Sequence, residues 1–495
     1  MSFGLDVATL EHTRELGRGI HSVVFLSKNK QGKEYAVKRV CCREGSHSAA
    51  LIEMDCLVRL KDVTGVIQLM GVSHTVKSDV AIRMVMKPYP YTLHTYIRNK
   101  SLDERLNNMK EVMDTLLVSL HYLKLNRIIH QDIKPENILI DDAIHSKERE
   151  EQSRSEDEGK EGRSRNINVV LADFSISTPL VYPYLSARDS EAYTQLYRPP
   201  EVCAKLAYGY PADMWALGMT MLEYVKGVEV IGESTLKYSL YKCNYNENKA
   251  ILNCIVDILC NENVGSGDKL ADINNGILSG RVDVHRIVSK YNLNQSIVDV
   301  LKSMLEVDPT LRYKPTPSSQ ADKEGEMSID IKGVDTLVRC GAVVTGFIET
   351  IILGLDIMAR YNMNSDDDME KVALVCLMLS MKLHKDTDNI DDCVRVFNIV
   401  TKHSTSIEEI ISIETRIISQ LKYKLSNPDI DPLVMEIGKT DSTRPLTYTP
   451  QGKKTAFALM ATYRKIASRG DHPKYTSYTE LASIYKSIIY PKDCR

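Results

Sequence analysis

Apolar and polar residues alternate along the first part of the chain. Between residues 10 and 40 the alternation is interrupted only by glycines at apparent turns, which predicts a hairpin-rich antiparallel sheet. Residues 47–60 change to a helical spacing, and strand-like runs return at 65–72 and 80–86. The apolar positions of residues 106–125 recur every three or four residues, which predicts a helix that faces the core. A sheet followed by helices predicts an α+β layout with two lobes.

Two segments interrupt this pattern. Residues 145–166 are nearly all charged, Ser and Gly, and they bury too little apolar surface to offset their ordering entropy. We predict a disordered insertion that is simply solvated, with a regulatory charged segment as the alternative. Pro, Ser and charged residues dominate residues 314–328, which is typical of an interdomain linker, placed at 316–329. The pattern after the linker predicts helices to the end of the chain, over 330–434 and 435–495.

Composition narrows the class of protein. The chain has 495 residues, more than one domain usually holds. Its 63 Lys and Arg and 66 Asp and Glu give a net charge of −3, so no basic excess indicates nucleic acid or an anionic membrane as a partner. The eleven cysteines form no C-x-x-C pair, which favours reduced thiols in the cytoplasm or nucleus. The start of the chain lacks a signal-peptide pattern, and the most apolar stretches, at 341–355 and 372–383, suit buried helices better than membrane spans.

A glycine-containing turn precedes a lysine at the end of an apolar strand. Gly17 and Gly19 allow the backbone to approach phosphate oxygens and to offer them N–H groups, although a plain hairpin turn fits this spacing as well. Lys38 follows at a spacing from which it can reach the α- and β-phosphates of a nucleotide. Such a lysine needs a carboxylate to hold it, and Glu53 on the next predicted helix is the candidate.

The segment from residue 130 to residue 137 carries the strongest chemical signal. Phosphoryl transfer needs a carboxylate near the attacking hydroxyl, a cation at the γ-phosphate and an oxygen ligand for a second Mg²⁺. Asp132, Lys134 and Asn137 supply these groups within six residues. Asp173 follows at the end of an apolar strand, where it is the candidate for the main Mg²⁺ ligand. Together these residues indicate a phosphotransferase site that uses ATP and Mg²⁺.

These motifs resemble those of the eukaryotic protein kinase family, over residues 10–313. The resemblance implies a two-lobed α+β protein kinase fold at 1–315, with ATP and Mg²⁺ as cofactors. The implied catalytic residues are Asp132 as base, Lys134, Lys38 and Glu53, and the implied metal ligands are Asn137 and Asp173. The residues implied in nucleotide binding are Leu16, Gly17, Gly19, Val24, Ala36, Lys38, the gatekeeper Met86, Lys87 and Tyr89 of the hinge, Lys134 and Asn137.

Two later motifs complete the resemblance. The run Tyr-Arg-Pro-Pro-Glu at 197–201 is similar to the A-P-E motif that ends the family's activation segment. The run Asp-Pro-Thr-Leu-Arg at 308–312 is similar to the motif that closes the domain. The family pairs the glutamate of the first motif with the arginine of the second. We therefore expect a buried Glu201–Arg312 ion pair.

Within this family the chain is similar to cyclin-dependent kinases. Residues 47–53 are similar to their P-S-T-A-I-R-E helix, and residues 194–198 to their T-x-x-Y-R run. Lys134 and the first threonine of that run are the Ser/Thr-specific version of the motifs, which implies Ser or Thr residues of proteins as substrates. A preference for Ser/Thr-Pro sites is a further hypothesis. Ala192 and Tyr193, where the subfamily has two valines, weigh against it.

The phosphate switch of the subfamily is absent. Asp189 stands at the position of the activating phosphothreonine, and Ile52, Gln131 and Thr178 replace the three arginines that grip the phosphate. A clamp of charge-assisted hydrogen bonds has no purpose without its donors, so we predict a kinase that is independent of activation-loop phosphorylation. Loss of kinase function is the alternative, against which the intact catalytic set argues. Ser175 replaces a glycine of the family, which should restrict a backbone flip.

The helical part after the linker resembles a cyclin box. Residues 372–379 are apolar on every side, which predicts a central buried helix, and Lys382 follows them. Residues 353–361 are similar to the second helix of the box. Lys382 and Glu414 stand where that family has a lysine and a glutamate that pair and contact the kinase. A generic helical module is the alternative, and residues 435–495 fit a truncated second box.

The order of the domains suggests a mechanism. An all-α cyclin-like domain at 330–434 that is tethered to a kinase has a high effective concentration at the helix around Glu53 and replaces a partner in trans. Docking there would hold Glu53 against Lys38, so the leading hypothesis is a Ser/Thr kinase activated in cis. The alternative is a weakly active scaffold that binds and titrates cell-cycle kinases and cyclins. Such a fusion is unlike ordinary cellular cyclin-dependent kinases and suggests a large DNA virus, whose protein would act in the cytoplasm or nucleus of a host cell.

Overall fold

The structure, a computed structural model, describes most of the chain. The described residues are 7–19, 22–41, 46–75, 81–142, 167–179, 192–259, 283–313, 331–344, 348–361, 368–384, 390–401 and 405–426, together with Leu433 and Leu459. The predicted insertion at 145–166, the predicted linker at 316–329, Asp189 and all of 435–495 except Leu459 lie outside these residues. The expectations for those segments, and the domain bounds that depend on them, stay predictions.

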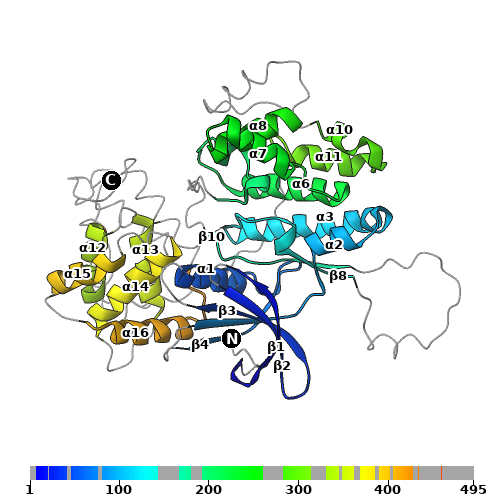
Figure 1. Cartoon of the computed structure of the whole chain (residues 1–495). Coiled ribbons are helices and arrows are strands. Elements are labelled where there is room, and N and C mark those ends of the chain that lie inside the picture. Colours follow the sequence, from blue (N-terminus) through cyan, green and yellow to red (C-terminus); the bar gives the residue numbers. More distant parts are fainter. Residues whose placement is uncertain are drawn as a thin grey trace, which may run out of the picture.

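The first lobe is built on a five-stranded antiparallel sheet (Figure 1). Its strands are β1 (Glu11–Arg18), β2 (Ser22–Lys28), β3 (Glu34–Cys41), β4 (Leu69–Thr75) and β5 (Ala81–Met86), in the order β1-β2-β3-β5-β4. Helix α1 (Ser46–Arg59) follows β3 and packs against it. The predicted hairpins and the predicted helix at 47–60 are confirmed.

One strand begins later than predicted. The apolar run predicted a strand from residue 65, whereas β4 begins at Leu69. Gly65 has a φ of +78°, a left-handed value that turns the chain, and a Cβ there would collide with the side chain of Ser119. Val66 then forms only an isolated bridge with Leu171. The first apolar residues of this run therefore lie in a turn and not in a strand.

The second lobe is helical. It comprises α2 (Leu93–Asn99), α3 (Leu102–Leu125), α5 (Pro200–Cys203), α6 (Tyr210–Lys226), α7 (Glu233–Lys242), α8 (Glu247–Leu259), α10 (Val284–Val288) and α11 (Gln295–Met304). A capping box of Ser101 and Glu104 starts α3, and its predicted apolar face packs against α6. The short strands β6 (Tyr91–Thr92), β7 (Ile128–Ile129), β8 (Ile138–Asp141), β9 (Asn168–Leu171) and β10 (Thr178–Pro179) form two small sheets that carry the loops of the site.

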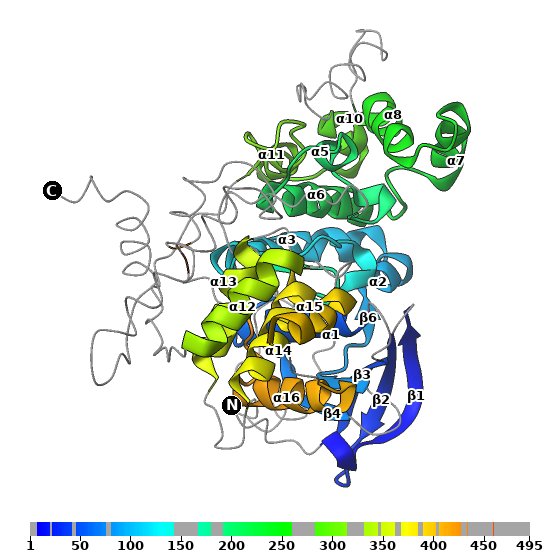
Figure 2. The same ribbon diagram turned by 90° about the vertical axis from the view of Figure 1, so that its left-hand side faces the viewer.

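A separate helical domain follows these lobes. Its helices are α12 (Ile331–Val344), α13 (Ile348–Arg360), α14 (Met369–Leu383), α15 (Ile390–Thr401) and α16 (Ile407–Gln420). The α14 helix contacts the other four and is buried throughout 372–377, which confirms the predicted central helix. The domain lies beside the sheet lobe, where α14 contacts α1 (Figure 1, Figure 2). Among the described residues, no helix has the length and apolar character needed to cross a bilayer.

Candidate active site

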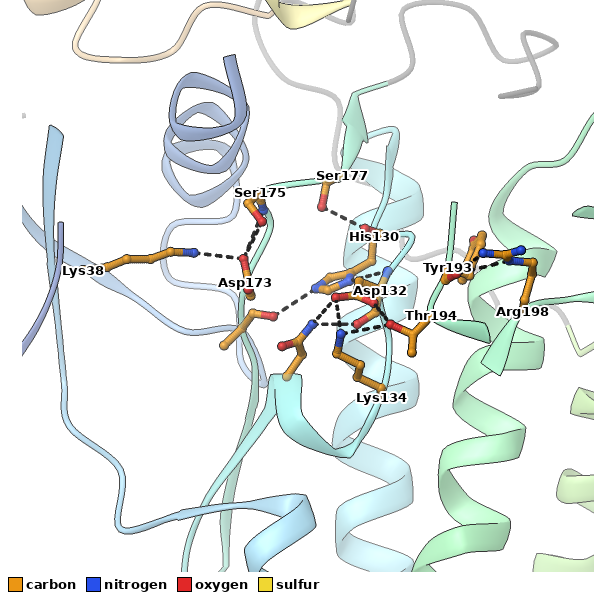
Figure 3. Close-up of polar contacts among 12 residues, drawn as sticks. Lys38, His130, Asp132, Lys134, Asp173, Ser175, Ser177, Tyr193, Thr194 and Arg198 are labelled. Atoms are coloured by element: carbon orange, nitrogen blue, oxygen red, sulfur yellow. Dashed lines mark hydrogen bonds and ion pairs between the residues drawn. The ribbon is translucent and has the colours of Figure 1, made fainter. Parts of the chain in front are cut away.

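Three charged side chains meet at the edge of the sheet lobe. Lys38 Nζ on β3 lies 2.6 Å from Glu53 Oε2 on α1. It also lies 2.9 Å from Asp173 Oδ1 (Figure 3). The side chains of Lys38 and Glu53 are buried, whereas that of Asp173 is 40% exposed. Burial alone would lower the pKa of Lys38, but the two carboxylates outweigh it and raise that pKa, so the lysine stays charged. The structure thus brings together the lysine and the glutamate that the sequence placed on neighbouring elements.

The carboxylate of Asp173 is held by two side-chain donors. Besides Lys38, the hydroxyl of Ser175 donates to Asp173 Oδ1 at 2.7 Å (Figure 3). Burial alone would raise the pKa of Asp173, but Lys38 outweighs it and, together with the Ser175 hydroxyl, lowers the pKa. We expected Ser175 only to restrict the backbone. Its hydroxyl also orients the carboxylate, which a glycine at this position could not do.

Asp132 lies at the centre of a hydrogen-bonded cluster (Figure 3). Its Oδ1 accepts a hydrogen bond from Thr194 Oγ1 at 2.7 Å. Its Oδ2 lies 2.7 Å from Asn137 Nδ2 and 2.8 Å from Lys134 Nζ. Lys134 Nζ also donates to Thr194 Oγ1 at 2.9 Å. Asp132 and Lys134 therefore both contact the threonine that the motifs associate with Ser/Thr specificity, and Asn137 joins the cluster through Asp132.

The backbone of this loop is fixed by Asp213 from α6. The N–H groups of His130 and Gln131 donate to Asp213 Oδ2 and Oδ1 at 2.7 and 3.0 Å. Gln131 has a φ of +68°, which is costly for a residue other than glycine, and the two hydrogen bonds hold it there. Tyr193 OH donates to the same carboxylate at 2.9 Å. Asp213 therefore couples the loop of Asp132 to the segment that ends at Thr194.

The side chain of Gln131 makes contacts that the sequence did not predict. Its Oε1 accepts a hydrogen bond from Thr178 Oγ1 at 2.8 Å, and its Nε2 donates to Tyr208 OH at 2.8 Å. We name Thr178, Gln131 and Tyr208 the neutral clamp. It joins β10, the loop of Asp132 and the segment before α6. Two of the three residues that replace the phosphate-binding arginines thus bind each other, and the third, Ile52, is buried.

The backbone of Tyr193 is turned toward Arg198. Tyr193 has a φ of +67°, and its carbonyl oxygen accepts hydrogen bonds from Arg198 Nε and Nη2 at 3.2 and 3.1 Å. Arg198 Nε also donates to the carbonyl of Ala192 at 3.0 Å. Burial and the Asp213 carboxylate raise the pKa of the Tyr193 hydroxyl, so it remains a donor. Both ends of Tyr193 are therefore fixed from the helical lobe.

Apart from Lys134 and Asn137, the residues expected to bind a nucleotide belong to the sheet lobe and to the segment directly after it. Leu16 and Gly17 lie in β1, Gly19 directly after it, Val24 in β2, and Ala36 and Lys38 in β3. Ala36 pairs in the sheet with Met86 at the end of β5, and both are buried. Lys87 Nζ lies 3.1 Å from Asp141 Oδ2 and 5.1 Å from the centre of the Tyr89 ring. The side chain of Lys87 is thus bound to β8, which leaves its backbone for a nucleotide contact.

The donor set fits a nucleotide with Mg²⁺. Asn137 donates its Nδ2 to the backbone and side-chain oxygens of Asp132 at 2.9 and 2.7 Å, which leaves its amide oxygen for a cation. The partly exposed carboxylate of Asp173 is a second candidate oxygen ligand. Among the described residues no group of three or more His, Cys, Asp or Glu could hold a metal.

The predicted Glu201–Arg312 ion pair is confirmed. Arg312 Nη1 and Nη2 bind Glu201 Oε1 and Oε2 at 2.6 Å each, and both side chains are buried. The guanidinium also lies over the ring of Trp215, 5.2 Å from its centre. This bidentate ion pair joins the segment after Thr194 to the end of the helical lobe.

The helical domain contacts α1 through the residues that the sequence marked. Lys382 Nζ on α14 lies 2.6 Å from Glu414 Oε1 on α16 and 3.3 Å from His47 Nδ1 on α1. His47 Nδ1 lies 3.9 Å from the same Glu414 oxygen. The expected lysine–glutamate pair is therefore formed, and it lies against the helix that carries Glu53.

Comparison with known proteins finds cyclin-dependent kinases among the similar sequences. The cyclin-dependent kinase 4 homolog of Caenorhabditis elegans is 30% identical over 217 residues, 42% of this chain and 47% of that protein. Cyclin-dependent kinase 4 of Xenopus laevis is 28% identical over 225 residues, 44% of this chain and 63% of that protein. Cyclin-dependent kinase 9-A of Xenopus laevis is 28% identical over 235 residues, 44% of this chain and 56% of that protein. The chain thus spans between 47% and 63% of the length of these relatives.

Other comparisons concern folds and domain families. A structure of the CAK complex from Chaetomium thermophilum bound to ATP-gamma-S aligns with a TM-score of 0.46 and 19% identity, over 62% of this chain and 88% of that chain. The model of the protein kinase domain matches residues 10–322, more than half of the chain, and the model of the cyclin N-terminal domain matches residues 299–426. The chain therefore belongs to the protein kinase family and carries a cyclin N-terminal domain behind its kinase domain.

Proposed function

We propose that the chain is an active protein serine/threonine kinase of the cyclin-dependent type, which transfers the γ-phosphoryl group of ATP to protein hydroxyls. The main observation in support is that Lys134 and Thr194 both contact the carboxylate of Asp132. The Lys38–Glu53 pair, assembled on the sheet side, supports the same proposal. A phosphotransfer assay with an Asp132 variant, described in the Discussion, tests it.

In the proposed reaction Asp132 accepts the proton of the attacking Ser or Thr hydroxyl. Lys134, 2.8 Å from that carboxylate, supplies positive charge where negative charge develops on the transferred group. Lys38 positions the α- and β-phosphates while its buried carboxylate partner fixes its direction. Asn137 and Asp173 would hold Mg²⁺, which neutralises phosphate charge when bound. The contribution of the chain is positioning and electrostatic stabilisation.

We also propose a preference for proline after the phosphorylated residue. Thr194 contacts Asp132, so the neighbouring Tyr193 borders the position of the next substrate residue. The carbonyl oxygen of Tyr193 is engaged by Arg198 and is not available to a substrate N–H group. Any residue with an N–H would lose a hydrogen bond on binding there, whereas proline has none to lose. This engagement argues for the Ser/Thr-Pro hypothesis despite the substituted valines.

Activation in cis by the helical domain is the next part of the proposal. Glu53 lies on α1, and the same helix contacts α14 and the Lys382–Glu414 pair through His47. Docking of the domain holds α1 in the position in which Glu53 reaches Lys38. A helix without this support is free to shift and to separate the buried pair.

Replacing both Lys382 and Glu414 with Ala is expected to lower kinase activity about tenfold or more, because α1 loses its charged contact with α14 and α16. Initial rates on a peptide substrate, with the full chain, measure the effect. Lys371 and Glu409 provide a matched control, since they form a more exposed ion pair between the same two helices at 2.9 Å. Equal activity of the two double variants would contradict activation in cis.

We further propose that the kinase does not depend on phosphorylation of its activation segment. The neutral clamp supports this proposal, because Gln131 and Thr178 stand at two of the three positions where the resemblance implies phosphate-binding arginines, and they bind each other. Gln131 also binds Tyr208. These bonds need no added charge. They connect the start of the segment to the loop of Asp132.

Treatment with a phosphatase is expected to leave the activity unchanged. The Gln131→Leu variant should lower it about tenfold, because Thr178 loses a partly buried hydrogen bond and Tyr208 a buried one. Steady-state rates and the intact mass of the protein give both readouts. Gln295→Leu, at an exposed position on α11, is the control. A large gain in rate after phosphorylation within residues 180–191 would contradict the proposal.

We propose that the protein acts in the cytoplasm or nucleus. Cys203, Cys243 and Cys376 carry free thiols, and all but Cys243 are buried. Buried free thiols are ordinary in these reducing compartments and uncommon among secreted proteins.

A further inference from the structure

Helix α1 buries a second carboxylate against the helical domain. Asp55 Oδ1 accepts hydrogen bonds from the backbone N–H groups of Leu425 and Ser426 at 2.7 and 2.9 Å. Ser426 Oγ donates to Asp55 Oδ2 and accepts a hydrogen bond from Arg59 Nη1 at 2.8 Å. Asp55 and Ser426 are 0% and 2% exposed. We name residues 424–426 the docking segment.

The helical domain presents the docking segment in a fixed orientation. After α16 ends, Lys422 and Tyr423 have φ values of +53° and +66°, which reverse the chain. Arg360 of α13 then binds the carbonyl oxygens of residues 424 and 425 at 2.7 and 2.5 Å. Asp356 holds the guanidinium of Arg360 at 2.6 Å. The carbonyl side of the segment is thus bound within its own domain, and its N–H side is bound by Asp55.

The burial of Asp55 makes this contact selective. An ionised carboxylate that is removed from water is strongly unfavourable unless donors surround it. The docking segment supplies three donors, two of them adjacent backbone N–H groups. Arg59, at 3.7 Å, is the charged partner of Asp55. An apolar partner surface in place of the docking segment would bury the carboxylate without its hydrogen bonds.

Asp55 also controls the rotation of α1. Two residues along an α-helix turn the side-chain direction by about 200°, so Glu53 reaches Lys38 while Asp55 reaches the docking segment. His47 contacts Lys382 about 12 Å away along the helix axis. Two points of attachment fix both the position of the helix and its rotation. A rotation that broke the Asp55 contact would also move Glu53 away from Lys38.

We propose that Asp55 is a specificity-determining docking residue, which selects as the partner of α1 a segment with two adjacent N–H groups and a small hydroxyl side chain. Residues 424–426 of this same chain meet that requirement. Asp55 recognises mainly backbone N–H groups, so its selectivity depends on the turn that presents these groups. The proposal rests on activation in cis, because a selected partner matters to the reaction only if docking controls α1.

Hydrogen exchange of the full chain, followed by mass spectrometry, tests the proposal. The amides of residues 425 and 426 are expected to exchange about tenfold faster or more in Asp55→Asn than in the wild type, and peptide phosphorylation should fall. Ser426→Thr keeps the hydroxyl and should resemble the wild type. Ser426→Val introduces a side chain of nearly the same size as threonine but without the hydroxyl, and this variant should resemble Asp55→Asn. Asp299→Asn, at an exposed position on α11, is the control.

The two readouts separate this proposal from activation in cis. Unchanged exchange at residues 425 and 426 in Asp55→Asn, or equal exchange in the Thr and Val variants, would overturn the docking role of Asp55. Faster exchange with unchanged kinase activity would support the docking role and overturn activation in cis. The Ser426 variants keep the test decisive if Asp55→Asn fails to fold.

Discussion

Replacing Asp132 with Asn is expected to lower the rate of phosphoryl transfer by about 10²–10⁴-fold. Asparagine has nearly the same shape, so Thr194 and Lys134 keep a polar partner and the loop keeps its form. The amide cannot accept the proton of an attacking hydroxyl, and it removes the negative charge beside Lys134. Initial rates of phosphate transfer from ATP to a peptide measure the loss. Calorimetric titration with ATP should show an affinity within a few-fold of the wild type.

The control for this experiment is Asp114→Asn. Asp114 lies on the exposed face of α3, where it pairs with Lys110, and its replacement should leave the rate unchanged. An Asp132→Asn variant that kept more than a tenth of the wild-type rate would exclude Asp132 as the base. If the wild type itself transferred no more phosphate than Asp132→Asn, the scaffold interpretation would replace the kinase interpretation.

Replacing Glu201 with Gln is expected to destabilise the helical lobe by about 3–5 kcal/mol. Arg312 would then lie in the core without a charged partner, since both side chains are buried. Trp215 is the only tryptophan of the chain and lies under this guanidinium, so its fluorescence reports the unfolding of this region in urea. The urea midpoint of the variant should fall accordingly.

A matched variant distinguishes the effect of breaking the buried ion pair from the effect of replacing an exposed glutamate. Glu233 pairs with Lys237 on the surface of α7, and Glu233→Gln should change stability by about 0–1 kcal/mol. A double variant, Glu201→Gln with Arg312→Met, should recover part of the loss because no charge is then buried alone. Equal urea midpoints for Glu201→Gln and Glu233→Gln would show that the buried pair contributes nothing.

Spacing and motif order made much of the fold and the site predictable. The helices and strands follow from apolar periodicity, which depends only on near neighbours in the chain. The approach of Lys38 to Glu53 and of Arg312 to Glu201 could be predicted because each pair belongs to motifs of fixed order. The Lys382–Glu414 pair was predictable for the same reason.

The contacts that the sequence did not predict involve partners that no motif or residue type marks. Gln131 was interpreted only as the loss of an arginine, and Tyr208, 77 residues away, has no motif that marks it as its partner. Asp55 binds backbone N–H groups, which every residue except proline carries, so no residue type identifies the docking segment. The late start of β4 depends on Gly65, where the left-handed φ and the close approach of Ser119 exclude a side chain.

The location of α1 and its partner helices on one chain has a consequence for dilution. Docking within one chain is a first-order equilibrium, whose position does not change with protein concentration. A kinase with a separate activating subunit loses active complex when both are diluted below their dissociation constant. In the proposed arrangement each molecule carries its activator at a fixed ratio of one to one. The specific activity should therefore be the same when few molecules have been synthesised as when many have. Neither the kinase domain nor its activating domain is ever present in excess.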